Sequence, residues 1–171
     1  MDYIRLAGSG MILLSSVWTG LHAALRLRRT HEELRDLTAA LELMRGEIRF
    51  AATPFAPLCR RAGQGRCASV QAFFSALRQE AEKPEPIPAG MTRRACAEAG
   101  ILLPESAMTV LERLFDGFGR CDRDGQLRQI QLASGELFRL SEELAAQMDG
   151  RCRTYKLLGL TVGAAMLVLV I

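Results

Sequence analysis

Apolar residues recur at every third or fourth position along two long stretches of the chain, with polar residues between them. The first stretch lies between residues 28 and 50 and carries Leu34, Leu37, Leu41, Met44 and Ile48. The second follows residue 122 and carries Leu127, Ile130, Ala133, Leu137, Leu140, Leu144 and Met148. This spacing places side chains on one face of an α-helix. Each stretch is therefore predicted to form a long helix with one buried face.

Capping and turn residues predict shorter helices between these two. Thr53 is expected to cap a second helix whose first residue is Pro54 and which ends at Gly63 and Gly65. Ser69 is expected to cap a third helix. The buried face of this third helix is predicted to hold Val70, Phe73, Phe74, Leu77 and Ala81.

Prolines and glycines separate the remaining helices. Residues 83–90, KPEPIPAG, are predicted to form an exposed connection. A fourth helix is expected over 92–99, and a fifth begins near Glu105, after Pro104. The inward positions of the fifth are Val110, Leu111, Leu114, Phe115 and Phe118. Asp122 is expected to cap the long final helix. Since no stretch alternates apolar and polar residues as a strand does, the expected fold is an all-α bundle of about six helices.

The chain begins and ends with apolar segments that predict two transmembrane helices. Residues 6–25 are 20 residues without a formal charge, enough for about 30 Å of helix, the apolar thickness of a bilayer. The 15 uncharged residues 157–171 reach only about 22 Å, so this segment has to recruit Tyr155 and Lys156 or thin the bilayer locally. The predicted division is a transmembrane helix at 4–25, a helical-bundle domain at 28–155 and a second transmembrane helix at 156–171.

Basic residues flank both apolar segments on the side of the bundle. They are Arg26, Arg28 and Arg29 after the first segment, and Arg151, Arg153 and Lys156 before the second. Because positive residues stay on the cytoplasmic side of a membrane, we expect a cytoplasmic bundle with both termini on the opposite side. The alternative for the first segment is a cleaved signal peptide, which would carry its positive charge before the apolar core. The alternative for the second is a segment buried in the protein core.

Glycines in the two apolar segments predict that these helices pack closely. Gly8 and Gly20 belong to a small-residue face of the first segment, and Gly159 and Gly163 form a G-x-x-x-G pair in the second. We therefore expect a membrane hairpin in which the two segments lie against each other.

Composition and motifs argue against an enzyme and against nucleic-acid binding. The net charge is only +3, and no basic cluster is interleaved with aromatic residues. The five cysteines include no C-x-x-C pair, and the sequence HEEL at His31 lacks the second histidine of a zinc motif. The chain also has no glycine-rich phosphate loop and no G-x-S-x-G elbow. We expect a non-enzymatic protein with no cofactor, no metal and no small-molecule substrate.

Four local patterns, in this order, resemble those of one known family. Trp18-Thr19-Gly20 lies in the first apolar segment, and residues 47–55, EIRFAATPF, match a junction of the form E-I-x-aromatic-x-x-T-P-apolar. Gly119-x-x-Asp122-x-x-x-Gln126, followed by Gln129 and Ile130, precedes the last helix, and Leu158-Gly159-x-x-x-Gly163 lies near the end. Over essentially its whole length, the chain resembles the stage III sporulation protein AB family.

This resemblance implies a part in endospore formation. Members of the family belong to a channel-like apparatus between mother cell and forespore, and their soluble domain is similar to the cytoplasmic domains of the type II secretion F platform protein. The implied partners are the membrane, a cytoplasmic secretion-type ATPase and other stage III sporulation membrane proteins. The implied location is the mother-cell membrane around the forespore. The alternative function is an inner-membrane platform subunit of a type II secretion or type IV pilus-like machine.

The two junction patterns supply the candidate site. If the first helix leaves the membrane and the last one returns to it, both junctions lie at the end of the bundle farthest from the bilayer. We expect the residues there either to bind the ATPase or to fix the starts of the helices. These candidates are Glu47, Thr53, Pro54, Asp122, Arg123, Gln126 and Gln129.

Overall fold

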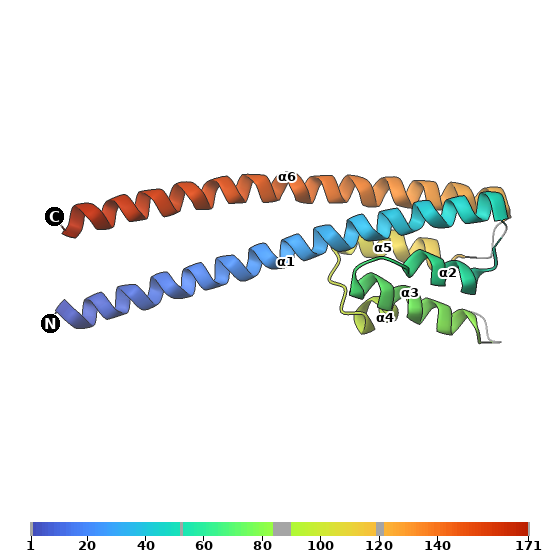
Figure 1. Cartoon of the computed structure of the whole chain (residues 1–171), viewed down its shortest axis with the longest axis horizontal. Coiled ribbons are helices and arrows are strands. Elements are labelled where there is room, and N and C mark those ends of the chain that lie inside the picture. Colours follow the sequence, from blue (N-terminus) through green and yellow to red (C-terminus); the bar gives the residue numbers. More distant parts are fainter. Residues whose placement is uncertain (1, 52, 84–89, 119–121, 171) are drawn as a thin grey trace. The chain divides into compact units, whose positions relative to one another are not determined.

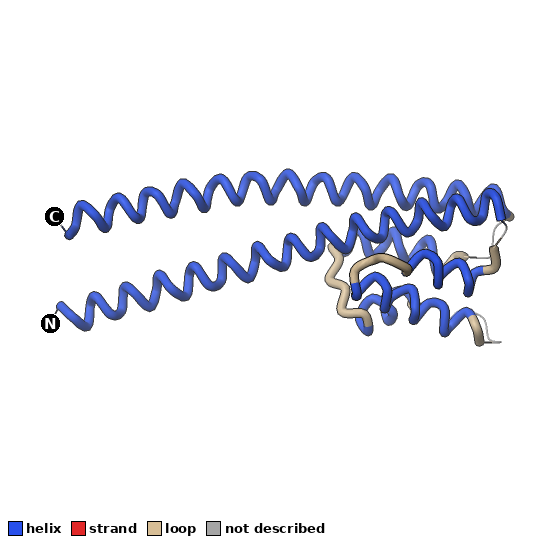
Figure 2. The backbone as a smooth tube through the Cα atoms, viewed as in Figure 1, coloured by secondary structure: helices blue, strands red, loops and turns tan. Residues whose placement is uncertain are grey.

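The computed structural model describes residues 2–51, 53–83, 90–118 and 122–170, and it is helical throughout apart from short connections (Figure 2). Side-chain surroundings are described for His22 and, within these ranges, from residue 25 to 147. The helices are α1 (Asp2–Ala51), α2 (Phe55–Gly63), α3 (Ala68–Ala81), α4 (Met91–Glu98), α5 (Glu105–Phe115) and α6 (Arg123–Val170) (Figure 1). No strand occurs in these ranges, so the predicted all-α fold with about six helices is confirmed.

The chain divides into two compact units. One comprises residues 1–29 and 144–171, and the other comprises residues 30–143. The helices α1 and α6 each contribute to both units without a break in their helical bounds. The second unit, which we call the bundle, contains α2 to α5 and carries the described core.

The predicted apolar stripes form the core of the bundle. Leu34, Leu37, Leu41 and Met44 of α1 are fully buried, and Ile48 is nearly so. Facing positions Ile130, Ala133, Leu137 and Leu140 of α6 are also buried. A direct link between the two helices comes from the Ser134 hydroxyl, which donates to Glu42 Oε1 at 2.7 Å. The helical periodicity therefore predicted the main buried surfaces of both long helices.

Aromatic side chains from several helices meet inside the bundle. Phe73 and Phe74 of α3 and Phe115 of α5 are buried in edge-to-face contacts, with ring centroids 5.2–6.1 Å apart. The ring of Phe55, at the start of α2, has its centroid 4.4 Å from that of Phe118. Phe118 was predicted to face inward and is half-buried. Such aromatic pairs add about 0.5–1.5 kcal/mol beyond the burial of their surface.

Two of the short helices, α3 and α4, begin where carboxylates from elsewhere in the bundle accept their N–H or hydroxyl groups. The prediction that Ser69 caps α3 is wrong, because α3 begins at Ala68 and the Ser69 hydroxyl donates to Glu33 Oε1 of α1 at 2.8 Å. The backbone N–H of Cys67 donates instead to Asp36 Oδ2 at 2.6 Å. The first N–H groups of a helix have no partner within it, and the helix dipole favours negative charge there.

The start of α4 is held in the same way. Gly90, which has a φ of +77°, donates its N–H to Asp116 Oδ2 at 2.9 Å. The buried Thr92 hydroxyl donates to Asp116 Oδ1 at 2.7 Å. The predicted connection at 83–90 falls mostly on residues 84–89, which lie outside the described part of the chain.

The predicted membrane hairpin concerns segments whose side chains lie almost entirely outside the described residues. In the part of the chain that the structure describes, no helix is both long enough and apolar enough to span a bilayer. Gly8, Gly20, Gly159 and Gly163 have helical backbone, and what packs against them lies outside the described side chains. The transmembrane helices at 4–25 and 156–171 therefore stay a prediction.

Candidate functional site

The two predicted junctions lie together at one end of the bundle. Arg123, the first residue of α6, donates from Nε to the carbonyl oxygen of Ile48 at 3.0 Å and from a terminal nitrogen to the carbonyl of Arg49. Both carbonyls belong to the last turn of α1, where helical carbonyls lack partners within the helix and where positive charge is favoured. The guanidinium of Arg123 thus joins the start of α6 to the end of α1.

Glu47 joins α1 to the following helix. Its Oε2 accepts hydrogen bonds from Arg61 of α2 at 2.6 Å and from the Thr53 hydroxyl at 2.9 Å. These hydrogen bonds, that from Arg61 above all, hold the pKa of Glu47 below its ordinary value. Glu47 is therefore ionised at neutral pH and holds both α2 and the connection before it against α1.

Thr53 and Pro54 do not act as predicted. The helix α2 begins at Phe55, Pro54 precedes it, and no side chain caps its start. The Pro54 carbonyl accepts the N–H of Leu58 at 3.1 Å, while the Thr53 hydroxyl donates to Glu47 and so caps nothing. Thr53 thus links the junction to α1 through Glu47, while Pro54 supplies the carbonyl of the first hydrogen bond of α2.

Asp122 caps α6 as predicted. Its Oδ1 accepts the N–H of Gly125 at 3.1 Å, and its backbone carbonyl accepts the N–H of Gln126 at 3.0 Å. Gln126 and Gln129 are half-buried and both make further polar contacts within the protein. Most of the predicted docking residues are therefore engaged in holding the bundle together.

Sequence reasoning missed the carboxylates that hold helix starts from a distance. Glu33 is buried in α1, and Asp36 lies one turn later on the same helix. A signal was available for Glu33, because it directly precedes Leu34 on the buried stripe, where a charged residue is unusual. Asp116 follows α5, and nothing near it in the sequence indicates its contact with α4.

The buried thiols have no arrangement that would make them reactive. Cys59 and Cys96 are fully buried, and desolvation is the main cause that raises the pKa of each thiol to about 12. Reactive cysteines need the opposite, a stabilised thiolate that is accessible to solvent. Among the described residues, no group of three His, Cys, Asp or Glu side chains is placed to hold a metal ion.

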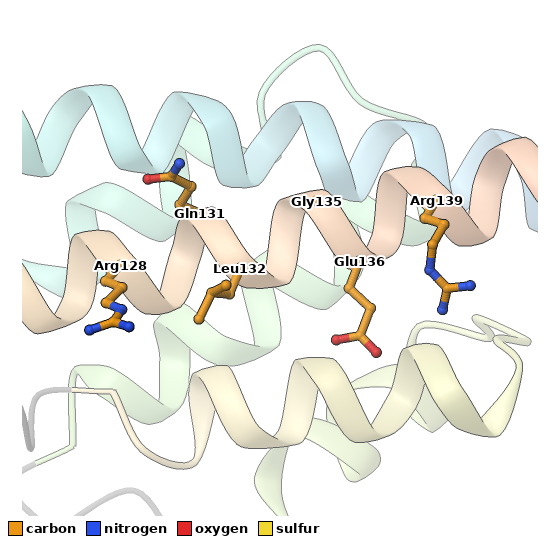
Figure 3. A pocket seen from close by; sticks show the side chains of 6 residues that line it. All are labelled: Arg128, Gln131, Leu132, Gly135, Glu136 and Arg139. Atoms are coloured by element: carbon orange, nitrogen blue, oxygen red, sulfur yellow. The ribbon is translucent and has the colours of Figure 1, made fainter.

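The open surface at this end of the bundle is a shallow groove between α1 and α6. It has a volume of about 440 Å³. Its lining residues are Arg45, Arg49, Asp124, Leu127, Arg128 and Gln131. A second depression of about 570 Å³ continues from it along the outer face of α6, lined by Arg128, Gln131, Leu132, Gly135, Glu136 and Arg139 (Figure 3). In that view Gln131 projects toward α1, while Leu132 and Glu136 project toward α5.

Comparison with known proteins finds similarity over nearly the full length of the chain. A family model described as stage III sporulation protein AB matches residues 5–171. Stage III sporulation protein AB of Bacillus subtilis (strain 168) is 25% identical over 169 residues, which cover 97% of this chain and 98% of that protein. A solved structure of a stage III sporulation protein AB has a TM-score of 0.63 at 21% identity, covers 71% of this chain and 97% of its own, and shares the fold.

Proposed function

This chain belongs to the stage III sporulation protein AB family, whose members are sporulation proteins, and we propose that it serves there as a membrane-anchored platform. In this proposal it is a non-enzymatic part of the channel apparatus between mother cell and forespore. It holds a cytoplasmic secretion-type ATPase against the other membrane proteins of that apparatus.

The observation that carries the proposal is the length of the family match. It extends from residue 5 to residue 171 and so includes the bundle and both apolar ends as one pattern. A protein that needed only its bundle would have no reason to keep two uncharged ends of these lengths. The arginines that follow the first end and precede the second support a cytoplasmic bundle.

The two long helices support a role in coupling. Each includes residues of the bundle core and residues of a terminal apolar segment within a single helix. At their other ends they are tied together through Arg123 and the last carbonyls of α1. A partner bound near this tie would act on both membrane helices at once, which suits a platform that passes movement to the membrane.

The described side chains support a non-enzymatic role. Glu47, Asp36 and Asp116 accept hydrogen bonds that hold helices in place. The thiols of Cys59 and Cys96 are buried with raised pKa values. These carboxylates therefore stabilise the packing of the helices.

The proposal is tested by complementation in a sporulating strain that lacks its own copy of the protein. The full chain should restore heat-resistant spores and be found in the membrane fraction together with the ATPase. A chain that ends at Tyr155 should fail in both respects, and adding an unrelated apolar helix of matched length should restore membrane attachment. Full complementation by the shortened chain from the soluble fraction would contradict the proposal.

A further inference from the structure

The groove between α1 and α6, which we call the arginine groove, is lined by arginines, most of which form no ion pair within the described part of the bundle. Three arginines line it, Arg45 and Arg49 of α1 and Arg128 of α6, with Asp124 as the acidic residue among them. Arg45 forms an ion pair with Glu42 of the same helix, with a nitrogen-to-oxygen distance of 3.0 Å. Arg49 and Arg128 are exposed, and within the described residues neither takes part in an ion pair. The groove therefore carries more positive than negative charge.

Arg123 shows by contrast what a structural arginine looks like at this end of the bundle. Its guanidinium donates hydrogen bonds to the carbonyls of Ile48 and Arg49 and so joins the start of α6 to the end of α1. In the ranges that the structure describes, the guanidinium groups of Arg49 and Arg128 have no such contacts, although the Arg49 carbonyl accepts from Arg123 and Arg128 follows Arg123 by only five residues. A guanidinium with free donors is well matched to a carboxylate, with which it forms paired hydrogen bonds.

An exposed aromatic ring adjoins the groove. Phe50 is 83% exposed, and the guanidinium carbon of Arg49 lies 5.5 Å from the centre of its ring. Aromatic residues and arginines side by side are the composition that dominates the binding energy of protein interfaces.

The spacing of the arginines defines the partner. Arg45 and Arg49 are four residues apart on α1, which places their Cα atoms about 6 Å apart along the helix. Carboxylates with the same spacing occur at positions i and i+4 of an acidic helix. An apolar residue beside them would cover Phe50.

We propose that the arginine groove and Phe50 form the docking site for an acidic helix of a partner protein, with carboxylates one helical turn apart. This inference deepens the proposed function, since it assigns the binding of the secretion-type ATPase to this surface. The predicted junction residues Glu47, Thr53 and Arg123 then support the surface from within and do not themselves touch the partner.

The test measures binding of the purified ATPase to the full chain in detergent. Arg49→Glu and Arg128→Glu should each weaken binding by about tenfold or more, because each removes a charge-assisted contact and adds a repulsive one. Phe50→Ala, which changes an exposed side chain and so spares folding, should weaken binding about fivefold. Binding by the unaltered chain should also fall steeply as salt is raised.

The matched control is Arg94→Glu, which makes the same change of charge at an exposed arginine of α4 outside the groove. It should leave ATPase binding unchanged. If all the groove variants bind as the unaltered chain does, the docking site is refuted while the platform function stands. If the unaltered chain does not bind the ATPase, the coupling function fails and the inference with it.

Vesicles containing anionic lipid separate protein docking from a membrane contact. The full chain in nanodiscs should not bind them through the groove, because the proposed partner is a helix. Vesicle binding that disappears in Arg49→Glu and Arg128→Glu but not in Arg94→Glu would overturn the proposal in favour of a lipid-binding surface.

Discussion

Replacing Asp116 by alanine tests how the bundle holds its helix starts. The change leaves the N–H of Gly90 and the hydroxyl of Thr92 without their acceptor at the beginning of α4. Thr92 is fully buried, so water cannot easily replace the lost partner. An orphaned buried hydroxyl costs about 1–3 kcal/mol and a lost helix cap about 1 kcal/mol. We therefore expect Asp116→Ala to lower the free energy of unfolding by about 2–4 kcal/mol.

A double-mutant cycle isolates the hydroxyl contribution. In a Thr92→Val background there is no hydroxyl left to orphan, so Asp116→Ala should then cost only about 1 kcal/mol for the cap. The free energies come from urea unfolding of the full chain in detergent, followed by circular dichroism. Asp124→Ala, at an exposed carboxylate in the first turn of α6, is the control and should cost less than about 1 kcal/mol. An equal cost of Asp116→Ala in both backgrounds would refute the reasoning.

Three further predictions follow from burial and hydrogen bonding. Phe73→Ala should destabilise the bundle by about 3–5 kcal/mol in the same unfolding assay, because it empties a fully buried aromatic site, whereas Phe50→Ala should cost less than about 0.5 kcal/mol. Because the folded pKa of Glu47 is lowered, its contribution is present above the ordinary value of 4.5 and lost as pH falls through the folded pKa. Unfolding midpoints of Glu47→Gln and the unaltered chain should thus differ at neutral pH and converge in acid. Cys59 and Cys96, with pKa values raised to about 12, should react with iodoacetamide at pH 8 only after unfolding, as mass spectrometry of the alkylated peptides would show.

The long helices could be predicted because their signal is local and repeated. The large buried apolar residues of α1 between Leu34 and Ile48 lie on one face of the helix, and each follows the last by three or four positions. The cap at Asp122 was also predictable, since its acceptor serves an N–H only three residues away. The end of α1 and the start of α6 had to meet once the order of helices was known.

The contacts that hold the starts of α3 and α4 could not be predicted because their partners are distant in the sequence. Ser69 has the composition of a cap, yet its hydroxyl binds Glu33, 36 residues earlier, and Asp36 serves the start of α3. The Thr53 hydroxyl likewise donates a hydrogen bond to the carboxylate of Glu47. A carboxylate is a strong acceptor for a hydroxyl proton, so one on a neighbouring helix fixes where a serine or threonine side chain is held.

The two predicted junctions meet at one end of the bundle, but the contacts of their residues differ from those expected. Arg123 was a candidate for docking and is bound to the carbonyls of α1. Arg49 and Arg128, which line the open groove, occupy positions that the two junction patterns leave unspecified. A single exposed arginine has no distinctive sequence context, and only the pairing of α1 with α6 brings these residues to one surface.

The proposed platform function requires that both ends of the chain enter the membrane and leave the bundle in the cytoplasm. Protease added to intact protoplasts of sporulating cells, and separately to inside-out vesicles from the same cells, measures this directly. With the bundle in the cytoplasm, residues 30–143 should be protected in protoplasts and cleaved in the vesicles. Cleavage of the bundle in intact protoplasts, or recovery of the full chain in the soluble fraction without detergent, would contradict it.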